Sequence, residues 1–572
     1  MASIEMHEFI GLQKKWSISK SSNGSDFEMQ RLVEHLLYLR GIITQQQSEE
    51  YLNTPESLYL PPSILTDLEV AITRVKKARD QKEKVCIYGD FDADGITGTA
   101  LLIKAFLRFG ISAIPYIPDR SSEGHGLNFG SLKKIASNGV KLIITVDCGT
   151  NDLEEISFAK SMGIDTIVTD HHASGMSESD AIAILNPKSE LNSNKFDQLT
   201  GVGMALKFAD ALLSGEFEDW DDGLFELAAI GTITDMAPLV GDNRYIVNKG
   251  IQELRSTKNI GLLQLMASAK IDHASVSAEN IGFSIGPRIN SAGRLGDAIV
   301  AFELLTTHST SKAIDLSGQL EKTNLERRVF TEEHIIHCTM LAEKLEDIGN
   351  LLIVGDHDLN VGIIGLTAGK LSEKFGVPTA VYSIKDQVVS ASCRTNTLFN
   401  WADALDTCAD LLIRYGGHAQ AAGFTCDISN LPELQVRLDA IAAEKFDPRF
   451  LISQGIIDAE ATPTIVMRDA FPIMKLMEPF GIGNPAPIFL GRNMLVDEVV
   501  YMGKDSQHLQ LKLRDHASIW TAIAFNQAWV EGTREADFVF SISISNWKGK
   551  PRLRLNIHDY FPVPESNLDR GG

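Results

Sequence analysis

The sequence lacks the features that mark secreted or membrane-bound proteins. No apolar run reaches the length of a membrane span, and the first residues lack the basic and apolar regions of a secretory signal. The six cysteines are scattered without a Cys-x-x-Cys pair, which argues against a zinc ribbon or a disulfide framework. Internal repeats and low-complexity stretches are also missing. We therefore expect a cytoplasmic protein without membrane contact.

Basic residues are scarce, because 53 lysines and arginines stand against 75 acidic residues and give a net charge of −22. Nucleic-acid binding draws on clustered positive charge, so this balance argues against tight nonspecific binding to duplex DNA. Net charge describes the whole surface, however, and a groove can be locally basic. A channel for a single strand is therefore not excluded.

A chain of 572 residues is too long for one hydrophobic core. Residues 1–75 are interpreted as an N-terminal extension of the first domain, and residues 76–307 alternate strand-like and helical segments, as in a parallel α/β sheet. Residues 308–346 contain no proline and one glycine and predict a long helix that joins two domains. Residues 347–450 predict a second α/β unit. Short alternating strands in residues 451–572 favour a small β-barrel of the oligonucleotide-binding (OB) type.

Aspartates follow four short apolar runs in the first half of the chain. The runs occupy residues 85–88, 142–146, 166–168 and 228–233 and are rich in β-branched side chains. Such runs are typical of buried parallel strands, whose carboxyl ends form the ligand-binding edge of an open α/β sheet. We therefore expect four parallel strands whose acidic ends lie together.

The chemistry of these ends predicts a metal site. An aspartate after a strand is often only a helix N-cap or a turn residue. Three alternating carboxylates, Asp90, Asp92 and Asp94, nevertheless repel one another and add nothing to a core unless a cation neutralises them. The neighbouring His171 and His172 suit Mn²⁺ or a similar ion that accepts imidazole. The sequence thus indicates metal-assisted chemistry, with a phosphate as the expected substrate.

Taken together, the motifs resemble those of the RecJ family, bacterial single-stranded-DNA-specific exonucleases of the DHH phosphoesterase superfamily. The residues that carry the resemblance are Asp147, Asp170-His171-His172, Asn243-Arg244, 89–95 (GDFDADG), 231–239 (GTITDMAPL), 287–294 (PRINSAGR), 416–423 (GGHAQAAG) and 479–485 (PFGIGNP). The match runs from about residue 55 to 562, nearly the whole chain. The fold it implies is α/β: a parallel-sheet DHH domain, a smaller α/β DHH-associated domain after a long helix, and a C-terminal OB-type barrel.

The resemblance implies two divalent ions, Mn²⁺ or Mg²⁺, and roles for the residues around them. Asp147 is expected to bridge the ions, at the spacing typical of two-metal hydrolases. The expected ligands of one ion are Asp92 and Asp90, and those of the other are Asp94, His171 and Asp235. His172 is expected to contact the scissile phosphate or to transfer a proton, and the alternative is that it only orients a metal ligand.

Further residues are expected to hold the DNA strand. His418 follows Gly417 in a turn where the backbone can approach a phosphate. The expected phosphate-binding residues of the two lobes are Arg288, Asn290, Arg294 and Arg394, although any single arginine is as well explained by an ion pair. Gly201-Val202-Gly203 precedes a predicted helix and either cradles a phosphate or lets that helix pack closely.

In the predicted barrel, Trp547 and Lys548 lie in a short basic stretch and are expected to contact DNA. Trp520, Phe525, Trp547 and Tyr560 are all candidates for stacking on bases. Because a small barrel needs large apolar side chains in its interior, at least two of the four are expected in the core.

Two departures from the family pattern stand out. Leu359-Asn360 occupy the place where the family usually carries Trp-His, so strand affinity or end preference could differ. Tyr88 stands where related phosphoesterases carry a metal-binding histidine, so one ion is expected to depend on Asp90 instead.

The resemblance implies a metal-dependent 5′→3′ exonuclease that degrades single-stranded DNA to mononucleotides in recombination and repair, acts as a monomer, and works with a single-strand-binding protein and a helicase. A phosphodiesterase for short oligoribonucleotides or dinucleotides is the first alternative, although the predicted barrel argues against it. A catalytically silent DNA-binding scaffold is the second, although none of the expected metal ligands is missing.

Overall fold

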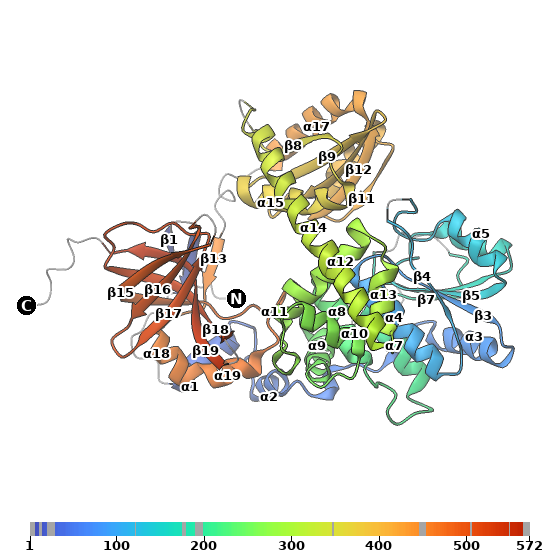
Figure 1. The fold of residues 1–572 in the computed structure, drawn as a ribbon, viewed down its shortest axis with the longest axis horizontal. Coiled ribbons are helices and arrows are strands. Elements are labelled where there is room, and N and C mark those ends of the chain that lie inside the picture. The colour runs from blue at the N-terminus through green and yellow to red at the C-terminus, as the bar shows by residue number, and fades with distance from the viewer. Residues whose placement is uncertain are drawn as a thin grey trace, which may run out of the picture.

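The computed structural model describes residues 6–10, 14–19, 29–120, 122–173, 179–188, 198–345, 348–445, 454–503, 506–547 and 550–563. They form a first α/β domain, called the DHH domain below after its Asp170-His171-His172 motif, a smaller α/β domain above it and a C-terminal β-barrel at its side, with one long helix between the two α/β domains (Figure 1). The predicted fold class is confirmed. No helix of the described chain is long and apolar enough to span a bilayer.

The sheet of the first domain consists of parallel strands in the order β4-β3-β5-β6-β7. The strands are β3 (Lys84–Tyr88), β4 (Ile114–Tyr116), β5 (Val140–Thr145), β6 (Asp165–Thr169) and β7 (Ala183–Leu185). The strands predicted at residues 85–88, 142–146 and 166–168 are therefore confirmed. Side chains alternate between the faces of a strand, so Val85 packs into one core and Cys86 into another.

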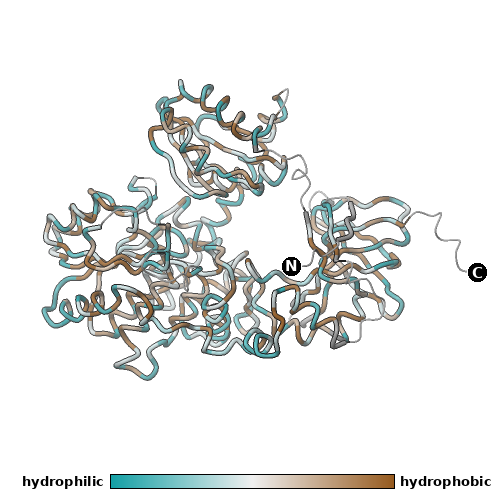
Figure 2. The backbone as a smooth tube through the Cα atoms, turned by 180° about the vertical axis from the view of Figure 1, so that it is seen from behind, coloured by the Kyte–Doolittle hydropathy of each residue, from teal (hydrophilic) through white to brown (hydrophobic). Residues whose placement is uncertain are grey.

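Helices cover both faces of this sheet. The face that contains Val85 is covered by α3 (Leu68–Asp80), α4 (Ala93–Arg108) and α7 (Gly201–Leu213), and α8 (Leu224–Thr234) packs on α4 and α7. The opposite face is covered by α5 (Phe129–Ser137) and α6 (Leu153–Ser161). Strands buried on both faces are mostly apolar, as in β5, where Lys141 is the one exposed residue, and hydrophobic segments of the tube are visible in Figure 2.

The strand predicted at residues 228–233 is wrong, because these residues belong to helix α8. Nearly every residue of α8 is buried, including Leu227, Ala228 and Ile230. A helix buried on all sides has no polar face, so its apolar run cannot be distinguished from a buried strand by periodicity. Asp235 consequently stands at the C-terminus of a helix and not at the end of a strand.

A group of helices completes the first domain and leads to the second. They are α9 (Gly241–Leu254), α10 (Ile260–Ser268), α11 (Ala278–Asn280), α12 (Gly286–Leu295) and α13 (Ile299–Thr306). The predicted connecting helix is confirmed as α14 (Thr310–Ala342), a single helix of 33 residues. Its first half packs on the DHH domain, and its last turns, with Cys338 and Ala342, pack into a core of the second domain (Figure 1).

The second α/β domain has a sheet of order β11-β12-β10-β9-β8. Its strands are β8 (Leu352–His357), β9 (Thr379–Lys385), β10 (Val388–Arg394), β11 (Arg414–Gly417) and β12 (Ala421–Asp427), and its helices are α15 (Val361–Phe375), α16 (Trp401–Thr407) and α17 (Leu431–Lys445). Only β8 and β9 pair in parallel. The edge strand β11 and the start of β12 carry the expected phosphate-binding turn around His418.

The barrel is closed by β15 (Phe489–Met502), β16 (His508–Arg514), β17 (Ile519–Phe525), β19 (Lys550–Pro562) and β18 (Glu535–Trp547), which pairs back with β15. Closure removes the free strand edges that would otherwise pair with other chains. The short β14 (Ala459–Glu460), α18 (Pro463–Ile465) and α19 (Phe471–Met477) lead into it.

The N-terminal segment belongs to the barrel, which differs from the expectation that residues 1–75 extend the first domain. Strand β1 (Met6–Ile10) pairs with β2 (Lys15–Ser19), and β2 pairs in parallel with β13 (Gln454–Ile457). Leu32 and Leu36 of α1 (Met29–Tyr38) lie in the barrel core. After α2 (Gln45–Asn53), the chain reaches the DHH domain, where Leu65 and Leu68 enter its core. A pairing across more than 400 residues leaves no local signal in the sequence.

Candidate metal centre

The first acidic motif turns from β3 into α4. Asp92 is the N-cap of α4, and its Oδ1 accepts the N–H groups of Asp94 at 2.9 Å and Gly95 at 3.1 Å. A Cβ on Gly95 would lie 2.6 Å from the backbone of Asp90, so only glycine fits there. The turn therefore presents three carboxylates from five consecutive residues.

The N-terminus of α7 holds one of these carboxylates. The N–H groups of Gly201 and Val202 donate to the Asp94 carboxylate oxygens at 2.7 and 2.9 Å. A Cβ on Gly201 would lie 2.5 Å from the Asp147 Cβ. Free N–H groups at a helix start favour an anion, here an aspartate of the protein. The glycines at 201–203 thus let α7 approach the metal centre, which favours the packing interpretation over the phosphate cradle.

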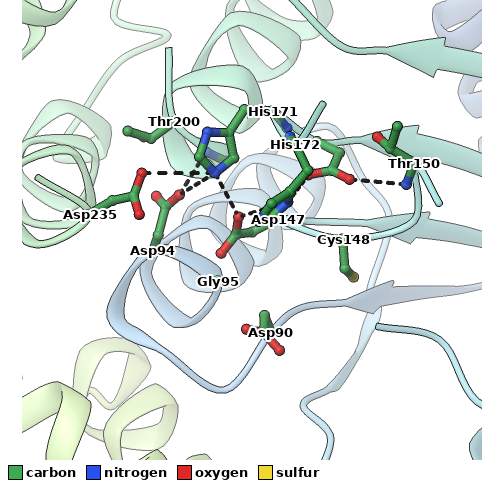
Figure 3. Close-up of polar contacts among 12 residues, drawn as sticks. Asp90, Asp94, Gly95, Asp147, Cys148, Thr150, His171, His172, Thr200 and Asp235 are labelled. Atoms are coloured by element: carbon green, nitrogen blue, oxygen red, sulfur yellow. Dashed lines mark hydrogen bonds and ion pairs between the residues drawn. The ribbon is translucent and has the colours of Figure 1, made fainter. Parts of the chain in front are cut away.

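Asp147 follows β5 with a φ of +61°, a left-handed conformation that is unusual for a residue other than glycine. Its N–H donates to the Thr169 carbonyl at 3.0 Å, and its Oδ1 lies 3.0 Å from Nε2 of His171. Strained backbone of this kind occurs where the surrounding structure fixes a functional side chain. In Figure 3, the imidazole of His171 lies among the carboxylates of Asp94, Asp147 and Asp235.

Asp170 organises the paired histidines. Its Oδ1 lies 2.7 Å from Nδ1 of His172 and accepts the His171 N–H at 2.7 Å, while its Oδ2 accepts the Thr150 N–H at 3.0 Å. Burial would raise the pKa of Asp170, but the hydrogen bonds from His172 and Thr150 outweigh burial and hold that pKa well below its usual range. Asp170 therefore positions the two imidazoles and has little capacity left for a metal ion.

The remaining side chains fall into overlapping sets of potential ligand atoms. Within each set, the atoms lie within 4.8 Å of one another, and the sets are Asp90, Asp92 and Asp147; Asp94, His171 and Asp235; and Asp147, His171 and His172. Asp147 belongs to two of the sets. The structure thus brings together all five expected metal ligands and Asp90, and these residues would hold divalent ions.

The electrostatics of this cluster fit a divalent cation. Burial, followed by repulsion from Asp92, raises the pKa of Asp94 to about 7, and burial with repulsion from neighbouring carboxylates also raises the pKa of Asp147. The buried Oδ1 of Asp90 has no hydrogen-bond partner among the described residues. Buried carboxylates that repel one another, one of them with an oxygen that lacks a donor, are suitable ligands for a hard cation. The donor set of carboxylates with one or two imidazoles fits Mn²⁺ or Mg²⁺.

His125 joins the centre, and the sequence did not predict it. Its Nδ1 lies 3.0 Å from Oδ2 of Asp90, and its ring centroid lies 5.3 Å from that of His172. Burial lowers the pKa of His125, but Asp90 raises it by more, to about 9. The buried Tyr88, which replaces a metal-binding histidine of related enzymes, donates from its hydroxyl to the Gly126 carbonyl at 3.0 Å and so holds the loop of His125. In the sequence, His125 is a single histidine between two glycines, and this pattern is too weak to predict a place at the metal centre.

The second domain contributes His418 to the same centre. The ring of His418 is parallel to that of His172, with centroids 6.2 Å apart. Gly417 has a φ of +132°, which glycine alone adopts easily, and the His418 N–H donates to the Ala421 carbonyl at 2.8 Å. The second domain therefore meets the first at these two histidines.

Arginines gather beside the acidic turn. Arg294 is largely buried, and its Nη1 donates to the Gly362 carbonyl at 3.2 Å. Burial, with the positive charges of Arg120 and Arg394, lowers the pKa of Arg294 to about 10. The guanidinium of Arg120 lies 5.0 Å from the ring centroid of Phe91. Three cations that repel one another favour a polyanion, and Arg120 is a member that the sequence did not indicate.

Models of three known domains match the chain. They are the DHH family N-terminal domain over residues 84–232, the DHHA1 domain over residues 347–444 and the RecJ OB domain over residues 457–559. The single-stranded-DNA-specific exonuclease RecJ of Bacillus subtilis (strain 168) is 33% identical, over 92% of this chain and 67% of that protein. The chain belongs to the RecJ family.

Crystal structures of RecJ support the family assignment at the level of the fold. The RecJ of Thermus thermophilus in complex with Mn²⁺ is 28% identical, has a TM-score of 0.80, and is matched over 94% of this chain and 76% of that chain. Its complex with Mg²⁺ is 27% identical, with a TM-score of 0.73 over 94% of this chain and 75% of that chain. Each of these RecJ structures contains a divalent ion of the kind that the donor set described above fits.

Other residues expected to bind DNA make contacts within the protein. Arg288 of this RecJ-family chain pairs with Glu321 of α14 at 2.5 Å. The Asn290 Oδ1 accepts the Ala93 N–H at 2.8 Å. This hydrogen bond holds the backbone of the first acidic turn. Asn360, at the family departure, is the N-cap of α15, and its side chain accepts the Gly362 N–H at 2.9 Å. These contacts give Arg288 and Asn290 supporting roles in the protein as it stands.

The barrel candidates are divided between core and surface. Tyr560 is buried in the barrel core, Trp520 packs partly against that core, and Phe525 is exposed. The backbone of Trp547 ends β18, but its side chain and all of Lys548 lie outside the described residues.

Proposed function

We propose that this RecJ-family protein is a metal-dependent exonuclease that hydrolyses single-stranded DNA from the 5′ end to mononucleotides. The observation that carries the proposal is the cluster of potential ligand atoms around Asp147, which shares one set with Asp90 and Asp92 and another with His171 and His172. Divalent ions held by such a cluster would supply the chemistry for hydrolysis of a phosphodiester. All three domains of the family are present, including the barrel that a dinucleotide hydrolase would not need.

The side chains of the centre have separate roles in the proposed reaction. Bound divalent ions would supply an activated water and charge stabilisation for the leaving oxygen. Arg120, Arg294 and Arg394 would bind the phosphates of the strand, since forked guanidinium donors match phosphate oxygens. His172, held by Asp170 at 2.7 Å, and His418 would contact the scissile phosphate from opposite lobes. Asp90, Asp92, Asp94, Asp147, His171 and Asp235 would hold the ions.

We also propose partners, a cellular location and an oligomeric state for this protein. An exonuclease for single strands needs unwound ends, so a helicase and a single-strand-binding protein are the expected partners in recombination and repair. A chromosomal substrate implies a cytoplasmic location in a bacterium. The metal centre is assembled from one chain, so activity as a monomer is expected.

The first test is digestion of a single-stranded DNA oligonucleotide, labelled at either end, with Mn²⁺ and with EDTA. We expect release of labelled mononucleotide from the 5′ end only, dependent on metal, with blunt duplex DNA and a 5′-blocked strand left intact. An exposed-site variant, Asp180→Asn, serves as the control that should cleave like the wild type.

Other outcomes would replace the proposal. Hydrolysis of two- to five-nucleotide RNA without cleavage of long DNA would favour the short-oligonucleotide phosphodiesterase. Metal-independent DNA binding without cleavage of any substrate would favour the silent scaffold. Release of mononucleotide from the 3′ end would support exonuclease activity but contradict the proposed 5′→3′ polarity.

A further inference from the structure

Two sequence motifs without a role in the metal centre meet at one place. Asn243-Arg244 lie near the start of α9 in the DHH domain, and residues 478–485 form the loop between α19 and the barrel. We call this place the junction: residues 235–239, Asn243, Arg244 and residues 478–485. It lies where the barrel side of the molecule joins the DHH domain (Figure 1).

Arg244 fixes the barrel side of the junction. It is 2% exposed, and its guanidinium donates to the carbonyls of Leu476, Met477 and Glu478 at 3.0–3.3 Å and to the Tyr51 carbonyl at 3.0 Å. Among the described residues it forms no ion pair, so its charge is balanced by carbonyl dipoles at the end of α19. A buried charge held in this way tolerates little displacement of the groups around it.

The barrel loop contacts the chain that leaves Asp235. The Leu239 N–H donates to the Ile482 carbonyl at 2.7 Å. A Cβ on Gly481 would lie 2.7 Å from the Leu239 side chain, and a Cβ on Gly483 would lie 3.0 Å from that of Pro238. Pro238 and Leu239 therefore lie directly on a loop that belongs to another domain.

Asn243 connects this segment to the other side of the metal centre. Its side-chain N–H groups donate to the Pro238 carbonyl at 3.0 Å and to the Gln198 carbonyl at 2.6 Å, and it is 1% exposed. Gln198 stands three residues before Gly201, whose N–H holds the Asp94 carboxylate at 2.7 Å. One amide thus joins the segment after Asp235 to the segment that anchors Asp94.

We propose that Asn243 is a positioning residue, which sets the distance between Asp94 and Asp235 in the ligand set that they share with His171. We further infer that Arg244 fixes the barrel to the same segment, so that the barrel supports a metal site that it does not touch. The inference rests on the proposed two-ion centre. It assigns a purpose to two motifs that contribute no ligand.

The test is a titration of the full-length metal-free protein with Mn²⁺ alone, by calorimetry, without DNA. The wild type should bind two ions. In Asn243→Ala, we expect one ion to bind about 10- to 100-fold more weakly, as is usual when a group that orients metal ligands is lost, while the other ion is little affected. The matched control is Asn259→Ala, because Asn259 also bonds two backbone groups of this domain, at 3.2 and 2.9 Å, away from the centre.

Arg244→Lys is the second variant, and it carries the test if Asn243→Ala does not fold. It keeps the positive charge but replaces the forked guanidinium with a single ammonium donor. The barrel loop should then be held less firmly, and the same ion should bind more weakly. Equal Mn²⁺ affinities in the junction variants and in Asn259→Ala would overturn the inference and leave the proposed function standing. A wild type that binds fewer than two ions would overturn the two-ion centre itself.

Discussion

At the scale of single residues, the sequence leaves two explanations of Asp92, a helix N-cap and a metal ligand. Its Oδ1 caps α4, and the same side chain belongs to the ligand set with Asp90 and Asp147. A carboxylate has two oxygens with about four lone-pair directions, so capping with one direction leaves others for a cation. A cap and a metal ligand are therefore compatible explanations of an aspartate that follows a strand.

Asp147 should be the most sensitive of the ligands. Asp147→Asn removes a negative charge that both proposed ions would share, so we expect cleavage of single-stranded DNA in Mn²⁺ to fall by about 10²–10³-fold or more, as when other hydrolases lose one electrostatic group. Strand binding, measured by fluorescence anisotropy, should stay close to that of the wild type. Wild-type turnover in this variant would contradict the two-ion assignment.

The acidic cluster also predicts how metal and pH act on stability. Because the pKa of Asp94 is raised to about 7 in the metal-free fold, the stability linked to its protonated form is present at low pH and is lost as pH rises through about 7. Bound Mn²⁺ relieves the repulsion between carboxylates. The increase in Tm on adding Mn²⁺ should therefore be larger at about pH 8 than at about pH 5.5 in a thermal scan. An equal increase at both values would show that these carboxylates do not repel one another in the metal-free protein.

At the scale of elements, the metal centre depends on how closely α7 approaches β5. Thr200 caps α7, and the next two N–H groups hold Asp94. The helix start therefore replaces a cationic side chain as the partner of a buried carboxylate, and it does so with fixed geometry. Helices and strand ends, rather than flexible side chains, set the positions of the ligands.

Gly201→Ala tests this approach. Alanine favours a helix over glycine by roughly 0.5–1 kcal/mol, but the new Cβ would lie 2.5 Å from the Asp147 Cβ and 2.9 Å from its Cα, so the steric effect should dominate. We expect weaker Mn²⁺ binding and slower cleavage.

The control is Gly318→Ala in α14, where a Cβ would meet nothing within 4 Å. It should raise the free energy of unfolding by up to about 1 kcal/mol without changing cleavage. Mn²⁺ affinities that fall equally in both variants would argue against a specific contact at Gly201.

At the scale of the whole molecule, an early and a late segment of the described chain pack together. Trp16 of β2 is 1% exposed, and its Nε1 donates to Oδ2 of Asp559 in β19 at 3.0 Å. The small sheet that contains β2 therefore packs against a barrel formed more than 400 positions later, and the DHH domain lies between them in the sequence.

Trp16→Ala should weaken the barrel selectively. Loss of a buried tryptophan costs roughly 3–5 kcal/mol, and Asp559 would lose a buried donor. Hydrogen exchange followed by mass spectrometry should show faster exchange in β18 and β19 and unchanged exchange in β3 and β5. Faster exchange throughout the DHH domain would contradict a separate stability for the barrel.

The sequence by itself determined the fold class, the strands at β3, β5 and β6, the helix α14 and the residues that meet at the metal centre. These features have local signals, since alternating carboxylates, paired histidines and short apolar runs are visible within a few residues. The metal roles of these residues stay a prediction until they are measured.

Only the tertiary structure decided the rest. It placed Asp235 at the end of helix α8, because an entirely buried helix and a buried strand have the same apolar composition. It brought His125 and Arg120 to the acidic turn and joined β2 to the barrel, because packing between distant segments depends on shape and burial that no local pattern contains.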